Sequence, residues 1–137
     1  MQRIMGVDIG EKRIGIAASD MLGITAQGVE TYTRTGGDSD AKYIADKAAE
    51  LGATTVVAGL PLNMNGSEGP SAEKARAFMS EVEALGLKVV FQDERLTTVS
   101  AERTLLEADM SRQKRRKVID KLAAVYILRA YLDTHSV

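Results

Sequence analysis

The chain has 137 residues, of which 45% are hydrophobic and 27% are charged, and its formal net charge is -1. These values are ordinary for a globular protein and predict one domain, residues 1–137, around a single core. The lack of Cys and the single His exclude disulfides and thiol catalysis and argue against a Cys/His zinc site. We recognise no signal peptide and no apolar run near the roughly 18 residues of a membrane span, so we expect a cytoplasmic protein without a membrane partner.

The first half of the chain is predicted to begin with three strands. Two of them form a hairpin around the turn Gly10-Glu11-Lys12, and a helix and an apolar strand follow the third. Asp38, Ser39 or Asp40 could cap this helix. The predicted ranges are 3–7, 13–18 and 24–33 for the three strands, 41–51 for the helix and 54–58 for the fourth strand.

The second half is predicted to continue with alternating helices and strands. A loop over 59–71 leads into a helix over 72–85, which Gly86 ends. Further predicted elements are a strand over 87–91, a helix over 99–108 and a last helix over 115–132. Three strands followed by this alternation are typical of an α/β protein with a mixed sheet.

Carboxylates stand at three places in the sequence where a charge is costly. Asp8 follows the first strand, Asp93 and Glu94 end the fifth, and Asp120 lies near the apolar face of the last helix. A carboxylate close to a core stays ionised only if a cation or hydrogen-bond donors offset its desolvation. If the three elements converge, their oxygens form a site suited to Mg²⁺ or Mn²⁺.

Each of these carboxylates also has a purely structural interpretation. Asp8 could hold the hairpin turn, Asp93 or Glu94 could cap the next helix, and Asp120 could pair with a basic residue one turn back. Adjacent strand residues point to opposite faces, so we expect one of Asp93 and Glu94 to face the metal site. Glu94 is preferred because its side chain is longer, and Asp93 stays an alternative.

Two groups of polar residues are predicted to contact nucleic acid. One is the loop after the fourth strand, whose amides and hydroxyl suit phosphate or sugar, and the other comprises basic residues. An idle turn and a solvated charged face are the respective alternatives. The scarcity of aromatic residues predicts contact with the backbone and not with stacked bases. The candidate contacts are Lys12, Arg13, Asn63, Asn65, Ser67, Arg95, Arg112, Lys114, Arg115, Arg116 and Lys117.

Four segments, MGVDIGEKRIGIA, VVAGLPLNMNGSEGP, DERLTT and KVIDKLAAVYIL, occur in this order along nearly the whole chain. Together they closely resemble the YqgF/RuvX family, whose members are called "putative pre-16S rRNA nuclease" or Holliday junction resolvase-like proteins. The resemblance implies an RNase H-like fold, a five-stranded mixed sheet whose first three strands are antiparallel, flanked by helices. It also implies metal-dependent hydrolysis of phosphodiester bonds, with Asp8, Glu94 and Asp120 as catalytic and metal-binding residues and Asp93 beside them in the DER motif.

The leading functional hypothesis is a nuclease that uses Mg²⁺ or Mn²⁺ on structured nucleic acid. Such chemistry needs neither a His base nor a Cys nucleophile, in agreement with the composition. Processing of the 5′ end of pre-16S ribosomal RNA is preferred, and a Holliday junction resolvase or a non-catalytic ribosome assembly factor are alternatives. An ATPase-like phosphate site, suggested by VDIG, is the least favoured. The expected partners are pre-ribosomal RNA or branched DNA and ribosomal particles, and the chain would be a monomer or homodimer.

Overall fold

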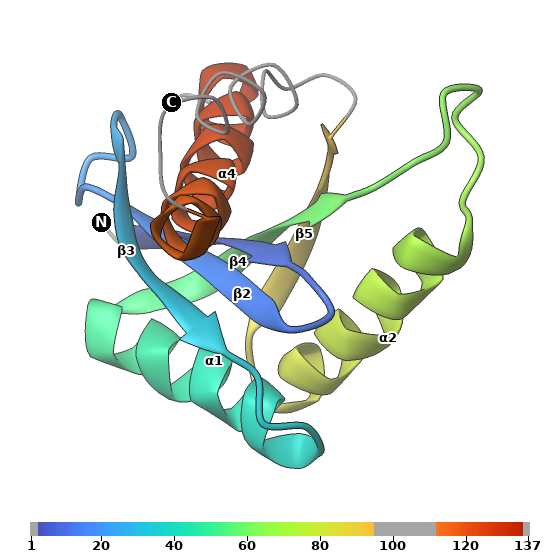
Figure 1. Cartoon of the computed structure of the whole chain (residues 1–137). Coiled ribbons are helices and arrows are strands. Elements are labelled where there is room, and N and C mark those ends of the chain that lie inside the picture. The colour runs from blue at the N-terminus through green and yellow to red at the C-terminus, as the bar shows by residue number, and fades with distance from the viewer. Residues whose placement is uncertain (1–2, 95–111, 136–137) are drawn as a thin grey trace.

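The computed structural model describes residues 3–94 and 112–135, which form a sheet with helices on both of its faces (Figure 1). The helix expected over 99–108 lies outside the described residues. The elements in chain order are β1 (Arg3–Ile9), β2 (Arg13–Ser19), β3 (Ala26–Thr33), α1 (Asp38–Leu51), β4 (Ala53–Leu60), α2 (Pro70–Ala84), β5 (Lys88–Asp93) and α4 (Arg112–Thr134).

The sheet has five strands in the order β3-β2-β1-β4-β5. The first three strands pair antiparallel, because β1 and β2 are joined by a tight turn in which the Gly10 N–H donates to the Arg13 carbonyl at 2.9 Å. β4 pairs parallel to β1, and β5 parallel to β4, because helices form the connections before them. The mixed RNase H-like sheet expected from the sequence is confirmed.

Two hydrophobic cores lie on opposite faces of this sheet. α1 and α2 cover one face and α4 covers the other (Figure 1). Alternation along β1 sends Met5 and Val7 into the core under α1 and α2. Gly6 faces α4, because a Cβ there would lie 2.8 Å from the Leu128 Cβ. Asp8, two residues further on, therefore belongs to the α4 face.

α4 lies unusually close to the sheet at Gly15. A Cβ on Gly15 would lie only 1.8 Å from the backbone oxygen of Asp120, so no side chain fits between strand and helix. The following turn is also close to the sheet, because a Cβ on Gly6 would lie 3.1 Å from the backbone oxygen of Ala124, and Ala123 and Ala124 are buried. Because Gly15 pairs with Asp8 across the hairpin, this contact brings the Asp120 segment alongside Asp8.

The observed elements differ from the expected ones mainly at their ends. β1 continues to Ile9, so Asp8 lies within the strand and not after it. α1 begins at Asp38 after Gly37, which makes no side-chain cap, and Asp40 instead accepts hydrogen bonds from backbone N–H groups before the helix. α2 begins at Pro70, since proline suits the first helical position.

The last helix begins at Arg112, three residues before the expected start. The buried residues of this helix in the described part of the chain include Ile119, Ala123, Val125, Ile127, Leu128 and Leu132. Within the described part of the chain, no helix is long and apolar enough to span a membrane.

Candidate active site

A cavity of about 880 Å³ opens at the edge of the sheet where β1, β4 and β5 end. Three of the residues that line it are the carboxylates of separate elements: Asp8 from β1, Glu94 after β5 and Asp120 from α4. Asp8 is buried, with 8% of its surface exposed. Segments that are far apart in the sequence thus bring these three residues to one place.

Glu94 owes its position to a glycine on the neighbouring strand. A Cβ on Gly59 of β4 would lie 2.6 Å from Glu94 Oε1 and 2.5 Å from Ile127 Cδ1 of α4, so the bare backbone leaves room for the carboxylate. Asp93, which pairs with Leu60, does not line the cavity. Strand alternation places these two adjacent acids on opposite faces, with Glu94 on the side of Asp8.

Asp120 is held by a cation from the hairpin. Arg13 Nε donates to Asp120 Oδ2 at 2.6 Å, and both side chains are partly buried. A charge-assisted contact of this kind is stronger than a neutral hydrogen bond. A second cavity, of about 360 Å³, lies beside this pair and is lined by Asp120, Arg13, Lys12 and the turn residues Gly10 and Glu11.

The donor set at the main cavity fits a hard divalent cation, since carboxylate oxygens are the ligands that Mg²⁺ and Mn²⁺ prefer. However, across residues 3–94 and 112–135, no three His, Cys, Asp or Glu side chains lie close enough together to hold one ion. Asp8, Glu94 and Asp120 thus share a cavity without forming a closed ligand shell. Asp120 is paired with Arg13 instead.

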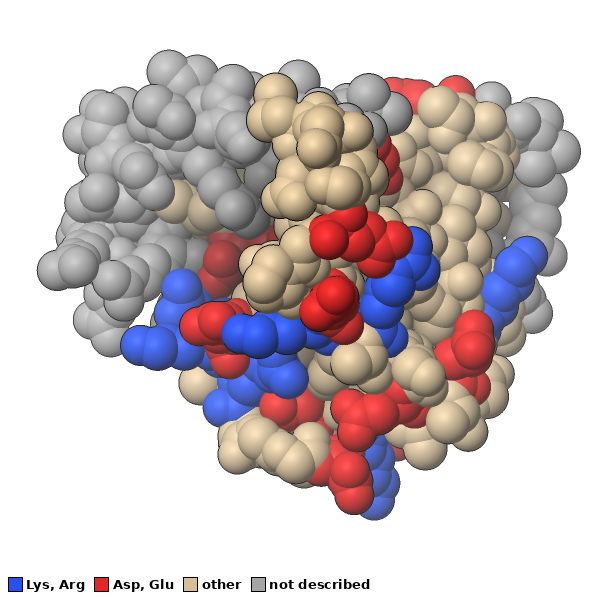
Figure 2. Space-filling model, turned by 90° about the vertical axis from the view of Figure 1, so that its right-hand side faces the viewer, with Lys and Arg blue, Asp and Glu red and all other residues tan. Residues whose placement is uncertain are grey.

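Negative charge dominates the part of the cavity lining that the structure describes. Besides the three carboxylates, Glu11 and Glu81 line it, against the two cations Arg34 and Lys74. Lys74 pairs with Glu11 at 3.1 Å, but both side chains are well exposed, so water screens this contact. On the face shown in Figure 2, acidic and basic side chains are interspersed over the described surface and form no broad basic field.

The loop predicted to contact nucleic acid follows β4 as expected, and its polar side chains bond one another. Asn63 Nδ2 donates to Ser67 Oγ at 3.0 Å, and the Ser67 hydroxyl donates to Asn65 Oδ1 at 2.6 Å. None of these three residues lines the main cavity, which Pro61 of the same loop does. In Figure 1 the loop projects beyond the edge of the sheet.

The predicted basic contacts are distributed differently. Lys12 and Arg13 lie at the second cavity, next to Asp120. The backbone of residues 112–117 forms the start of α4, and the side chains of its basic residues lie outside the described part of the chain, as does Arg95.

Sequence reasoning did not identify Arg34 or Phe78 as cavity residues. Their only local signals are a cation directly after a strand and an aromatic residue on the buried face of a helix, and both patterns are common in proteins without such a site.

Comparison with known proteins agrees with this architecture. Thermus thermophilus RuvC in complex with a Holliday junction substrate aligns with a TM-score of 0.57 at 13% identity, covering 99% of this chain and 98% of that one. The fowlpox virus resolvase with its Holliday junction DNA aligns with a TM-score of 0.56 at 10% identity, covering 96% and 97%. At such low identity these likenesses establish the fold alone.

Other proteins have much higher sequence identity with this chain. A protein of Clostridioides difficile (strain 630) named "Putative pre-16S rRNA nuclease" is 55% identical over 132 residues, covering 96% of this chain and 94% of the relative. A protein of the same name from Myxococcus xanthus (strain DK1622) is 54% identical, covering 97% and 89%. The family model described as "RuvX: Holliday junction resolvase" matches residues 2–134. The chain therefore belongs to the RuvX family.

Proposed function

We propose that this chain is a divalent-metal-dependent nuclease that hydrolyses phosphodiester bonds in structured nucleic acid. The observation that carries the proposal is the convergence of Asp8, Glu94 and Asp120, from three separate elements, on one cavity at the edge of the sheet. The names of the close relatives, which describe a nuclease, support the same assignment. A single domain, residues 1–137, acting in the cytoplasm is part of this proposal.

The three carboxylates would hold Mg²⁺ or Mn²⁺ through their oxygens. Such an ion, when bound, lowers the pKa of an attacking water and stabilises the leaving oxygen. β1 fixes the buried Asp8, and Gly59 leaves the space in which Glu94 lies. Asp120 must turn from Arg13 to join them, which leaves the Arg13 guanidinium at the second cavity, where it would contact a substrate phosphate.

For the substrate, we propose processing of the 5′ end of pre-16S ribosomal RNA within ribosomal particles. The support is the shared name of relatives above 50% identity over nearly the whole chain. A Holliday junction resolvase is a second candidate, favoured by the family description. Resolution requires two active sites for paired cuts, so it would also require a homodimer.

The test is cleavage of three end-labelled substrates: a 16S ribosomal RNA precursor, a four-way DNA junction and a plain single strand. Each is incubated with Mn²⁺, Mg²⁺ or a chelator. We expect the RNA precursor to be cut only with a metal ion, and Asp8→Asn, Glu94→Gln and Asp120→Asn each to lower the rate by a factor of about 10³ or more. Glu83→Gln, an exposed change on α2 away from the cavity, is the control.

Paired cutting of the junction, with the RNA left intact, would favour the resolvase. Metal-independent binding without cleavage of any substrate would favour an assembly factor. Wild-type rates in one of the three carboxylate variants would remove that residue from the site.

A further inference from the structure

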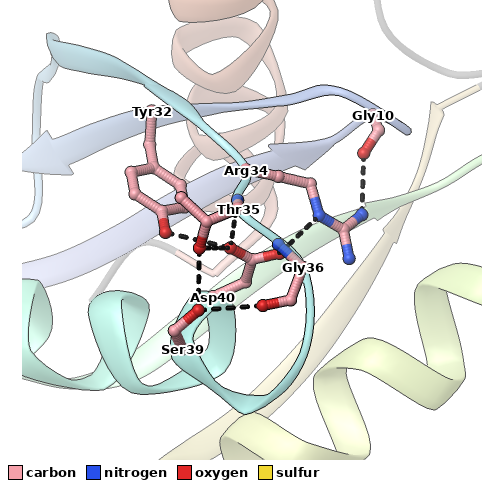
Figure 3. A network of polar contacts seen from close by, with 7 residues as sticks. All are labelled: Gly10, Tyr32, Arg34, Thr35, Gly36, Ser39 and Asp40. Carbon is pink, nitrogen blue, oxygen red and sulfur yellow. Dashed lines mark hydrogen bonds and ion pairs between the residues drawn. The ribbon is translucent and has the colours of Figure 1, made fainter.

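Arg34 lies at the main cavity in a fixed orientation. It follows β3 directly, and its side chain is about one-quarter exposed. Figure 3 shows its guanidinium between the Asp40 carboxylate and the Gly10 carbonyl: Nε donates to Asp40 Oδ2 at 3.1 Å, and Nη1 donates to the Gly10 oxygen at 2.9 Å. The Arg34 backbone N–H also donates to the Lys12 carbonyl at 2.9 Å. Arg34 thus donates hydrogen bonds to residues on both sides of the β1–β2 turn.

Asp40 does not depend on Arg34 alone. This fully buried carboxylate also accepts hydrogen bonds from the Tyr32 hydroxyl and the Thr35 N–H, both at 2.9 Å, and from the Gly36 N–H at 3.2 Å. The Thr35 hydroxyl also donates to Asp40 Oδ1, at 3.4 Å, so four donors besides the guanidinium already satisfy its two oxygens. Neutralising a buried acid does not by itself explain why an arginine extends to the cavity wall.

Packing fixes the remaining freedom of the guanidinium. Its carbon atom lies 4.8 Å from the centre of the Phe78 ring, and Phe78 lines the same cavity. Within the described part of the chain, the third guanidinium nitrogen, Nη2, makes no hydrogen bond. A planar cation held at two nitrogens and on one face is preorganised to donate its remaining N–H groups to an oxyanion.

The acidic lining of the cavity explains why a cation is needed there to bind a nucleic-acid backbone. Among the residues that the structure describes, five carboxylates and two cations line it, and the second cation, Lys74, is exposed and already paired with Glu11. A nucleic-acid backbone entering this cavity is repelled unless some positive charge faces it. Of the two cations that line the described part of the cavity, Arg34 is the one that is partly buried and held by several contacts.

From this arrangement we infer that Arg34 is a phosphate-binding residue, which holds a phosphodiester of the substrate backbone on the cavity wall that Arg34 shares with α2. Asp40 and Gly10 are the residues that position it. The inference rests on the proposed nuclease function and names a contact of that same site. Arg34 would thus bind the nucleic-acid backbone at a fixed position, separate from the carboxylates that would hold the metal.

The experiment measures binding of a fluorescein-labelled single-stranded RNA in chelator, between low and moderate salt, for wild type, Arg34→Gln and Arg34→Lys. Loss of one phosphate contact on a single strand lowers the slope of log affinity against log salt by about 0.7. We expect that loss in Arg34→Gln, and a slope close to wild type in Arg34→Lys, which keeps the charge. Unfolding by heat shows that each variant is folded.

Arg76→Gln is the matched control. Arg76 is also ion-paired, to Glu68 at 2.6 Å, and also lies over an aromatic ring, that of Phe91 at 4.8 Å, but it does not line the cavity. Its slope should equal that of wild type. An unchanged slope in folded Arg34→Gln would overturn the inference and leave Arg34 as a support of the hairpin turn.

A second measurement on the unaltered chain covers the case in which Arg34→Gln does not fold. Phenylglyoxal modifies arginine side chains, and mass spectrometry of peptides gives the rate at each position. Bound RNA should slow modification of Arg34 several-fold and leave that of Arg76 unchanged, while equal rates at Arg34 with and without RNA would overturn the inference. Cleavage by wild type with Mn²⁺ tests the nuclease proposal separately, because binding in chelator does not depend on it.

Discussion

Asp40 shows at the scale of one residue how burial and hydrogen bonding compete. Burial raises its pKa, but hydrogen bonds from the backbone, Arg34 and Tyr32 outweigh that effect and lower the pKa from 3.8 to about 2. A carboxyl whose pKa is lower in the folded state stabilises the fold above its unfolded pKa. This contribution is complete above about pH 4 and is lost as the pH falls through about 2.

Replacing Asp40 should therefore have a pH-dependent cost. In Asp40→Asn, two backbone N–H groups, two hydroxyls and a guanidinium would face one carbonyl oxygen and an NH₂ group. We expect the free energy of unfolding at pH 7 to fall by about 2 kcal/mol. Urea unfolding at pH 7, 4 and 2.5 measures the difference from wild type, which should shrink toward pH 2.5.

Asp38→Asn is the control, since Asp38 is exposed in the first turn of the same helix. It should change stability by no more than a few tenths of a kcal/mol. A penalty for Asp40→Asn that stays constant over this pH range would mean that shape, and not charge, gives Asp40 its role.

Individual site residues could be predicted only where a local rule applies. The alternation of side chains along a strand predicts that only one of Asp93 and Glu94 faces the site, the longer side chain and the family resemblance favoured Glu94, and Glu94 is the one that lines the cavity. No such rule finds Arg34. Its place depends on contacts with Gly10, 24 positions away along the chain, and with Phe78 on another helix.

At the scale of elements, the close approach of α4 to the sheet affects both the stability of the fold and the position of Asp120 at the cavity. Gly15→Ala would place a Cβ 1.8 Å from the Asp120 backbone oxygen, which cannot move without the helix. We expect the free energy of unfolding to fall by about 3 kcal/mol or more. Because the helix carries Asp120, cleavage by the remaining folded protein should also fall.

The matched change is Gly28→Ala on the neighbouring strand β3. The three atoms nearest to its Cβ would all belong to the side chain of Lys121, with Cγ at 2.7 Å, and this flexible side chain can move aside. Chemical unfolding of both variants measures the contrast, and the cost at Gly28 should stay below about 1 kcal/mol. Equal costs at the two glycines would show that α4 shifts easily and that its contact with Gly15 is not rigid.

The elements themselves were largely predictable, and their ends were not. Gly10-Glu11-Lys12 defines the hairpin, and apolar periodicity defines α2 and α4, because these are local patterns. The predicted capping residue of α1 was wrong, because Asp40 lies inside the helix and its carboxylate accepts hydrogen bonds from the Thr35 and Gly36 N–H groups. The sequence predicted that Asn63 and Asn65 contact nucleic acid, with an idle turn as the alternative. Hydrogen bonds within the loop and contacts with a substrate require the same residue types, so the sequence does not separate the two.

At the scale of the whole molecule, the mixed sheet with α4 on one face and α1 and α2 on the other gathers carboxylates that would repel one another. The sequence pattern predicted this architecture, whereas the electrostatic balance of the cavity depends on side chains from several segments that are distant along the chain. Metal binding and folding stability should therefore be linked in this chain.

The last prediction follows from that linkage. An ion that binds only the folded state at about 100 times its dissociation constant raises the free energy of unfolding by about 2.7 kcal/mol. We expect Mn²⁺ to raise the melting temperature of wild type and to leave that of Asp8→Asn nearly unchanged. In chelator, Asp8→Asn should melt at the same temperature as wild type or at a higher one, because removing one charge from the carboxylates at the cavity relieves repulsion. Thermal unfolding with Mn²⁺, with Mn²⁺ plus excess chelator, and with chelator alone measures both effects, using Glu83→Gln as the control. An equal rise with Mn²⁺ in wild type and Asp8→Asn would place the ion elsewhere on the molecule, since Asp8 is the most deeply buried of the three carboxylates on which the metal proposal depends.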